Sequence, residues 1–147
     1  MRIRKHTLNV EKSKELLSKM PEGSIQKKEC YVNMFFCQMY HRKFFVNEGY
    51  KIAYGYVNVS NKLYTRHAFI VDANNEAIDP TLALREDFDK DVDDKSGTYF
   101  SFYIFDDVDN YVDAVGENDR YPDLIKPMRE KERFIDCLLY TSPSPRD

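Results

Sequence analysis

Three residues that together can carry acyl-transfer chemistry occur along the chain in the order Cys30, His67 and Asp79. A cysteine thiolate is a nucleophile, a histidine can take its proton, and a carboxylate can hold the imidazole in one tautomer. Such a triad attacks the carbonyl carbon of an amide or ester and passes through a thioester. The sequence therefore predicts a cysteine-dependent acyl-transfer enzyme. In it, Cys30 is the nucleophile, His67 is general base and then acid, and Asp79 orients His67.

The stretch RHAFIVDANNEAIDPT, residues 66 to 81, contains two of these residues and has the pattern of a β-hairpin. Strand side chains alternate between faces, so His67 and Asp79 share a face only if the connecting loop has an odd number of residues. A loop of three or five residues centred on Ala73 places them directly opposite one another. A two-residue turn turns Asp79 to the other face. We expect the odd loop, because its asparagines tolerate left-handed backbone.

Cys30 is expected at the start of a helix. Apolar residues occupy nearly every face of the segment from Tyr31 to Phe45, which predicts a helix that is buried on all sides. First-turn N–H groups and the helix dipole stabilise a thiolate at such a position. Gln26 and Asn33 are candidates for stabilising the oxyanion of the reaction or for positioning the substrate, and the backbone N–H of Cys30 is a further candidate oxyanion donor.

The remaining pattern predicts an α+β protein in which this helix packs on a mostly antiparallel sheet of about four strands. We expect strands within residues 49–60, 63–72, 76–80 and 98–105. We expect further helices within residues 9–20, 82–90, 106–115 and 121–135, and a frayed N-terminus around His6.

The motifs ECYVN at Cys30, RHAFIVD at His67 and EAIDPT at Asp79 resemble those of the transglutaminase-like branch of the papain-like superfamily. They also resemble small phage and bacterial proteins with a Cys-Tyr-x-Asn, His-Ala-aromatic and Asp-Pro-Thr pattern. The resemblance covers about residues 26 to 82. It implies a papain-like core and amide or peptide hydrolysis, or transglutaminase-like acyl transfer. The chain departs from transglutaminases in having no tryptophan, and Phe69 stands where one is often found.

Composition sets the other expectations. The 147 residues, 42% of them hydrophobic, suffice for one α+β domain, which we place at residues 1–136. A net charge of −3 disfavours nucleic-acid binding, and no apolar run is long enough for a membrane span. We expect a soluble, cytoplasmic protein without cofactor or metal, acting on an amide- or ester-bearing substrate, with proteins among the candidates.

The last residues, CLLYTSPSPRD from Cys137 to Asp147, resemble the translation of a sequencing-library adapter. We therefore expect residues 137–147 to be a non-native tail. The alternative is a genuine disordered tail rich in serine and proline.

A non-enzymatic interpretation of the triad residues is also open. Cys30 can be a structural thiol, and Asp79 before Pro80 suits a helix N-cap. The chain is then an α+β binding or inhibitor protein on a papain-like scaffold.

The sequence disfavours two possible metal sites. A zinc site including Cys37 and His41 is disfavoured, because structural zinc ligands usually come in closely spaced pairs. The acidic run at residues 86–94 lacks the glycine turn of a calcium loop and is expected to be a solvated loop.

Overall fold

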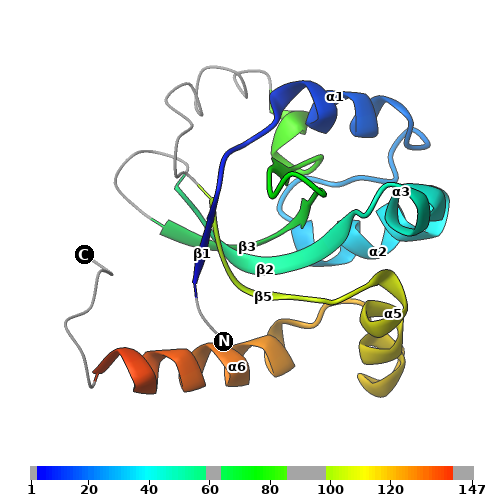
Figure 1. The fold of residues 1–147 in the computed structure, drawn as a ribbon. Coiled ribbons are helices and arrows are strands. Elements are labelled where there is room, and N and C mark those ends of the chain that lie inside the picture. Colours follow the sequence, from blue (N-terminus) through cyan, green and yellow to red (C-terminus); the bar gives the residue numbers. More distant parts are fainter. Residues whose placement is uncertain (1–2, 59–63, 86–98, 141–147) are drawn as a thin grey trace.

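Antiparallel strands form one curled sheet in the order β1-β5-β2-β3-β4 (Figure 1). The computed structural model describes residues 3–58, 64–85 and 99–140, with side chains described up to residue 133. Within these ranges the strands are β1 (Arg4–His6), β2 (Lys51–Asn58), β3 (Tyr64–Val71), β4 (Ala77–Ile78) and β5 (Tyr99–Ile104). With the helices around this sheet, the predicted α+β class is confirmed.

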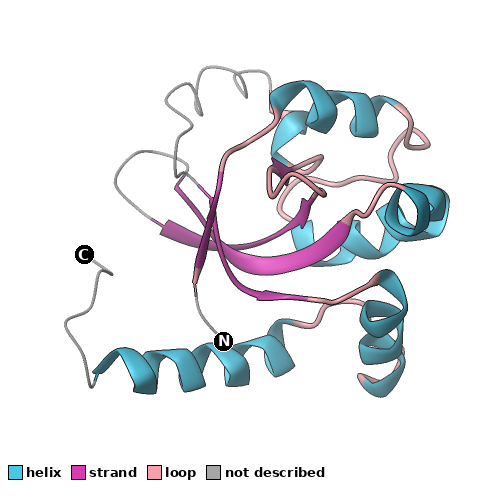
Figure 2. Cartoon of the chain, viewed as in Figure 1, coloured by secondary structure: helices cyan, strands magenta, loops and turns pink. Residues whose placement is uncertain are grey.

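Helices lie on more than one side of the sheet, and Figure 2 shows α1 above it and α5 and α6 below it in this view. The helices are α1 (Val10–Ser18), α2 (Cys30–Tyr40), α3 (Arg42–Asn47), α5 (Val108–Glu117) and α6 (Ile125–Tyr140), with a short 3₁₀ helix η1 (Leu82–Leu84). Asn9 caps α1 by accepting a hydrogen bond from the backbone N–H of Lys12, and Asp107 caps α5 in the same way. No helix in the described ranges is long and apolar enough to cross a membrane.

Two hydrophobic clusters lie on the sheet. The larger one joins α2, α5 and α6 to the face that carries Ile70, and it includes Met34 and Tyr111. A fully buried apolar side chain such as that of Met34, which is 0% exposed, contributes roughly 1.5–3 kcal/mol to folding. The smaller cluster includes Phe69 and Tyr99. Because His67 is two residues from Phe69 along β3, it points to the face with the smaller cluster.

Strand β1 was not predicted from the sequence, which suggested a frayed N-terminus around His6. It pairs antiparallel with β5, and His6 at its end is 1% exposed instead of frayed. The Nδ1 atom of His6 lies 3.0 Å from the carbonyl oxygen of Asn75, and its Nε2 atom lies 2.7 Å from Oγ of Ser101. A strand of three residues is too short to show a hydrophobic period, so the expectation of a frayed terminus was wrong.

Other expected elements differ in their bounds. The buried helix expected from Tyr31 to Phe45 is two helices, because the backbone leaves the helical region at His41, where φ is −134°. Where a helix was expected within residues 82–90, the structure has the short helix η1, which is followed by extended backbone at Arg85. Residues 86–90 lie outside the described residues, as does the acidic run at residues 86–94. Helix α6 extends to Tyr140, into the segment expected to be non-native, and residues 141–147 are not described.

Candidate active site

The hairpin between β3 and β4 has the predicted odd loop, but its centre is one residue further along. Ile70 pairs with Ile78, and Val71 pairs with Ala77, which centres the loop on Asn74 instead of Ala73. Extending this register by one residue places Asp79 opposite Phe69, not directly opposite His67. Because residues 67 and 69 share a face, Asp79 remains on the same face as His67.

The loop is shifted because Asp72 closes it. Its backbone N–H donates to the carbonyl oxygen of Glu76, and its Oδ1 atom accepts from the backbone N–H groups of Asn74 and Glu76. Asn75 takes the left-handed conformation, with φ of 65°. Asparagine accepts this conformation at low cost, and this was the reason to expect the odd loop.

His67 and Asp79 form a buried hydrogen bond. The Nε2 atom of His67 lies 2.8 Å from Oδ2 of Asp79, and the two residues are 6% and 0% exposed. The other carboxylate oxygen, Oδ1, accepts from the backbone N–H of Leu82 at 3.1 Å. The backbone N–H of Asp79 donates to Oγ of Ser13 at 2.8 Å. Asp79 thus holds the turn into η1 and the imidazole at the same time.

Cys30 is the first residue of α2, and its sulfur lies at an open edge of β3. Strand β4 ends at Ile78, so it does not continue along β3 beside Ala68. There the backbone N–H of Ala68 donates to Sγ of Cys30 at 3.5 Å. The thiol therefore reaches round the strand edge to the residue next to His67. The residue before α2, Glu29, makes no side-chain capping bond, so no such cap covers the first-turn N–H groups.

The charge environment favours a protonated His67. Burial lowers the pKa of the imidazole, whereas the Asp79 carboxylate and the Cys30 sulfur raise it, and the net pKa is about 10. Because Nε2 bonds to Asp79, Nδ1 is the ring nitrogen that is left for Cys30. This arrangement allows one ring nitrogen to exchange a proton with the thiol while the other is held by the carboxylate.

Asn33 joins the loop before α2 to the Asp-Pro-Thr turn. Its Nδ2 atom donates to the carbonyl oxygen of Gln26 at 2.8 Å and to Oγ1 of Thr81 at 2.9 Å. Its Oδ1 atom accepts from the backbone N–H of Gln26 at 3.1 Å. With both amide hydrogens engaged, Asn33 positions Cys30 relative to Asp79 and has no hydrogen free for an oxyanion.

The two other candidate oxyanion donors are the Gln26 side chain and the backbone N–H of Cys30. The Gln26 side chain is on the surface, where Nε2 donates to the carbonyl oxygen of Gly23 at 2.5 Å. The backbone N–H of Cys30 lies at the start of α2 and keeps its place as a candidate donor. An oxyanion role for either group stays a prediction.

Tyr99 is a member of this cluster that the sequence analysis did not identify. Its hydroxyl donates to Oδ2 of Asp79 at 2.5 Å, and the residue is 0% exposed. It lies on β5, and β2 separates β5 from β3 in the sheet. The one indication in the sequence is Gly55 on β2, which pairs with His67 on one side and Ser101 on the other. A residue without a side chain allows a neighbouring backbone to approach closely, and a Cβ at Gly55 would lie 1.8 Å from the carbonyl oxygen of Phe100 on β5.

Cys37 and His41 lie outside the candidate site, in surroundings that suit a structural role. Cys37 is 0% exposed in the larger core, and burial raises its pKa far above the usual range. The Nε2 atom of His41 lies 2.6 Å from the carbonyl oxygen of Lys19. In the described part of the chain, no three His, Cys, Asp or Glu residues are grouped so as to hold a metal ion.

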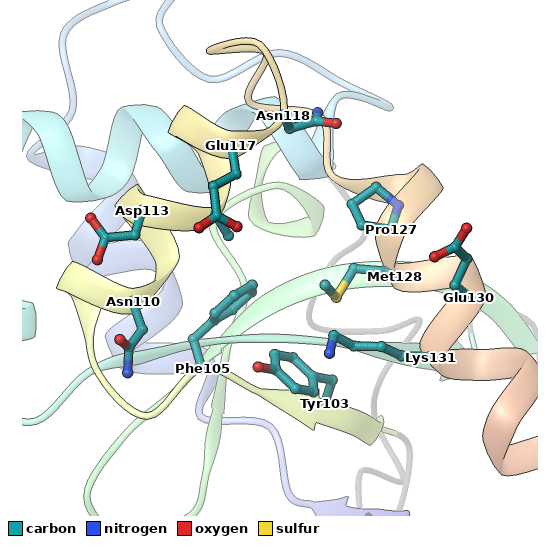
Figure 3. Close-up of a pocket in the computed structure, with 11 residues that line it drawn as sticks. Tyr103, Phe105, Asn110, Asp113, Glu117, Asn118, Pro127, Met128, Glu130 and Lys131 are labelled. Atoms are coloured by element: carbon teal, nitrogen blue, oxygen red, sulfur yellow. The ribbon is translucent and has the colours of Figure 1, made fainter.

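A separate cavity lies between β5, α5 and α6 (Figure 3). Its volume is about 820 Å³. Tyr103 and Phe105 form an aromatic floor, and Nζ of Lys131 lies 4.5 Å from the ring centroid of Tyr103. Asp113 and Glu117 of α5 line it, as Figure 3 shows. None of the triad residues lines this cavity.

Comparison with known proteins gives no family for this chain. No protein-family model, curated protein or solved structure matches it. A function therefore has to be inferred from its own residues and their geometry.

Proposed function

We propose that the chain is a cysteine-dependent acyl-transfer enzyme on a papain-like core, acting on an amide- or ester-bearing substrate through a thioester. The observation that carries this proposal is the chain of contacts from Cys30 to Asp79. Sγ of Cys30 accepts the N–H of Ala68, and the adjacent His67 is bonded through Nε2 to Asp79. A nucleophile, a base and an orienting carboxylate in contact form the arrangement of nucleophilic catalysis.

The reaction follows from these positions. The proton that the Cys30 thiol and Nδ1 of His67 exchange lies on Nδ1 when Sγ of Cys30 forms a bond to the carbonyl carbon of the substrate. When the C–N or C–O bond breaks, the leaving amine or alcohol takes the proton from His67. Water or an acceptor amine then gives a proton to His67 and attacks the thioester carbon, and Cys30 leaves as the thiol after it regains that proton. Asp79 holds the imidazole in the required tautomer throughout.

The papain-like core is part of the proposal. It is supported by the cysteine at the start of a helix that packs on an antiparallel sheet, with His67 on β3 and Asp79 just after β4. The buried Asn33 bridge between the loop before α2 and Thr81 joins two of the three motifs on which the resemblance rests.

One observation favours the second candidate, a non-enzymatic binding or inhibitor protein. Cys30 and His67 are only 7% and 6% exposed. The 820 Å³ cavity between β5, α5 and α6 contains no triad residue. A scaffold that kept the triad contacts without chemistry would bind a partner elsewhere on its surface.

An activated ester separates the two candidates. The protein is incubated with p-nitrophenyl acetate, and intact mass and peptide mapping locate any acetyl group. The enzyme hypothesis predicts an acetyl thioester on Cys30 and release of p-nitrophenol, abolished in Cys30→Ala. Loss of base catalysis in His67→Ala lowers the rate by about 10²-fold or more. The control Cys37→Ala keeps the activity. Turnover that is the same in Cys30→Ala and His67→Ala, with folds confirmed by circular dichroism, contradicts the proposal.

A further inference from the structure

We propose that Tyr99 is a positioning residue of this site. Its hydroxyl fixes the Asp79 carboxylate and weakens the attraction of this carboxylate for the proton on His67. This inference rests on the proposed function. It assigns a role to a residue of β5, outside the three motifs that suggested the triad.

The Asp79 carboxylate accepts hydrogen bonds from three donors. Oδ2 accepts from Nε2 of His67 at 2.8 Å and from the Tyr99 hydroxyl at 2.5 Å, while Oδ1 accepts from Leu82 N–H. An O–H···O distance of this length is typical of a charge-assisted bond to a carboxylate. A carboxylate that is 0% exposed is costly to bury unless such donors compensate the lost water. Three donors from three segments leave the carboxylate little freedom to rotate.

Tyr99 has a distinct effect on the proton of His67. When His67 is an imidazolium, its own charge stabilises the Asp79 carboxylate. When His67 is neutral, the carboxylate depends more strongly on its other donors, so the Tyr99 hydroxyl stabilises the neutral state more than the protonated state. The hydroxyl therefore lowers the pKa of His67 relative to a site without it. Deacylation needs neutral His67 as base, so this bond supports the second half of the reaction.

The groups around His67 come from several elements. Cys30 approaches from α2, Asp79 from the end of β4, and Tyr99 from β5, with ring centroids of His67 and Tyr99 6.4 Å apart. The ring of Phe69 stacks on His67, and His6 of β1 contacts this Phe69 ring. The charge of Arg66, the residue before His67 on β3, is compensated by Glu132 of α6, with which Arg66 forms bidentate hydrogen bonds. Tyr99 is the neutral donor that reaches the same carboxylate oxygen as His67.

The test is an NMR titration of the His67 imidazole in the full chain, with Cys30→Ser as background so that no thiolate titrates nearby. His67→Gln identifies the signal among the three histidines. Tyr99→Phe removes only the hydroxyl and should raise the pKa of His67 by about one unit, the size expected for a lost hydrogen bond to a charged group. Tyr111→Phe is the matched control. Tyr111 is also 0% exposed, but its hydroxyl has no hydrogen-bond partner among the described residues.

A second substitution keeps the test decisive if Tyr99→Phe does not fold. Genetically encoded 3-fluorotyrosine at position 99 keeps the hydroxyl and makes it a stronger donor, so the pKa of His67 should fall. A folded Tyr99→Phe protein with an unchanged pKa of His67, or an unchanged pKa with fluorotyrosine, overturns the inference.

Thiol reactivity of the unmodified chain separates this inference from the proposed function. A reactive Cys30 with a pKa of His67 that is insensitive to Tyr99 rejects the Tyr99 role alone. An unreactive Cys30 with the expected shift rejects the enzyme and retains the coupling between Tyr99 and His67.

Discussion

The sulfur of Cys30 lies 3.5 Å from the backbone nitrogen of Ala68, the residue that follows His67 in β3. This contact exists because β4 ends at Ile78 and does not extend along β3 at this point. A helix on one face of the sheet can therefore place its first side chain beside a histidine that points to the other face. The early end of β4 thus allows the proposed nucleophile to reach the proposed base.

The pH dependence of stability should report the environment of His67. Its pKa is raised from 6.5 to about 10 in the folded chain, so the folded state holds a proton that the unfolded state has lost between these values. The stabilising contribution is complete below about pH 6.5 and is lost as the pH rises toward about 10, by up to about 1.4 kcal/mol per pH unit. Urea unfolding at several pH values measures this slope.

The control for that slope is His67→Gln. Both proteins carry Cys30→Ser, so that the thiol does not contribute. The His67→Gln protein should lose most of the slope between pH 7 and 9. An equal slope with and without His67 contradicts a raised pKa of this residue.

Gly55 should not tolerate a side chain. A Cβ atom at this position would lie 1.8 Å from the carbonyl oxygen of Phe100, at the point where the register between β2 and β5 shifts. Gly55→Ala should reduce the free energy of unfolding by at least about 2 kcal/mol. Gly116→Ala is the control, because a Cβ there meets no atom within 4 Å, and it should raise the stability by up to about 1 kcal/mol. Denaturant unfolding of both variants measures the difference, and equal stabilities contradict the close approach.

Asn33 should matter for stability and for the reactivity of the thiol. Asn33→Ala removes two hydrogen bonds to the backbone of Gln26 and leaves the buried hydroxyl of Thr81 without this partner, which should cost about 2 kcal/mol of unfolding free energy. Because the loop before α2 is then free to move, alkylation of Cys30 should also slow. Asn47→Ala, at an exposed position in α3, should change stability by no more than about 0.5 kcal/mol. An Asn33→Ala protein with unchanged stability and thiol reactivity contradicts the bridging role.

The sequence was sufficient to predict the main helices and strands and the odd number of residues in the loop between β3 and β4. Alternation and apolar runs locate β2, β3, β5 and α2, because these elements bury a regular face. The loop of the hairpin was expected to be odd on the basis of its asparagines, and Asn75 indeed takes the left-handed conformation. The exact centre of the loop depends on Asp72, whose side chain accepts two backbone N–H groups, and strand alternation alone does not determine this.

Other features depend on contacts between distant segments. His6 becomes buried because β1 pairs with β5, about 95 residues later in the chain, and binds Ser101. Tyr99 reaches Asp79 across β2, and no sequence spacing predicts such a contact. Asn33 was a candidate oxyanion donor in the sequence, but its partners Gln26 and Thr81 are found only in the folded chain.

Thiol alkylation at pH 6 tests whether Cys30 is an activated nucleophile of the proposed catalytic triad. The protein is treated with iodoacetamide, and peptide mass spectrometry follows the labelling of Cys30 and Cys37 with time. We predict fast labelling of Cys30 that slows strongly in His67→Ala, and very slow labelling of Cys37, which is 0% exposed with a raised pKa. A Cys30 that reacts no faster than Cys37 in the folded protein, or one whose rate does not depend on His67, contradicts the proposed catalytic triad.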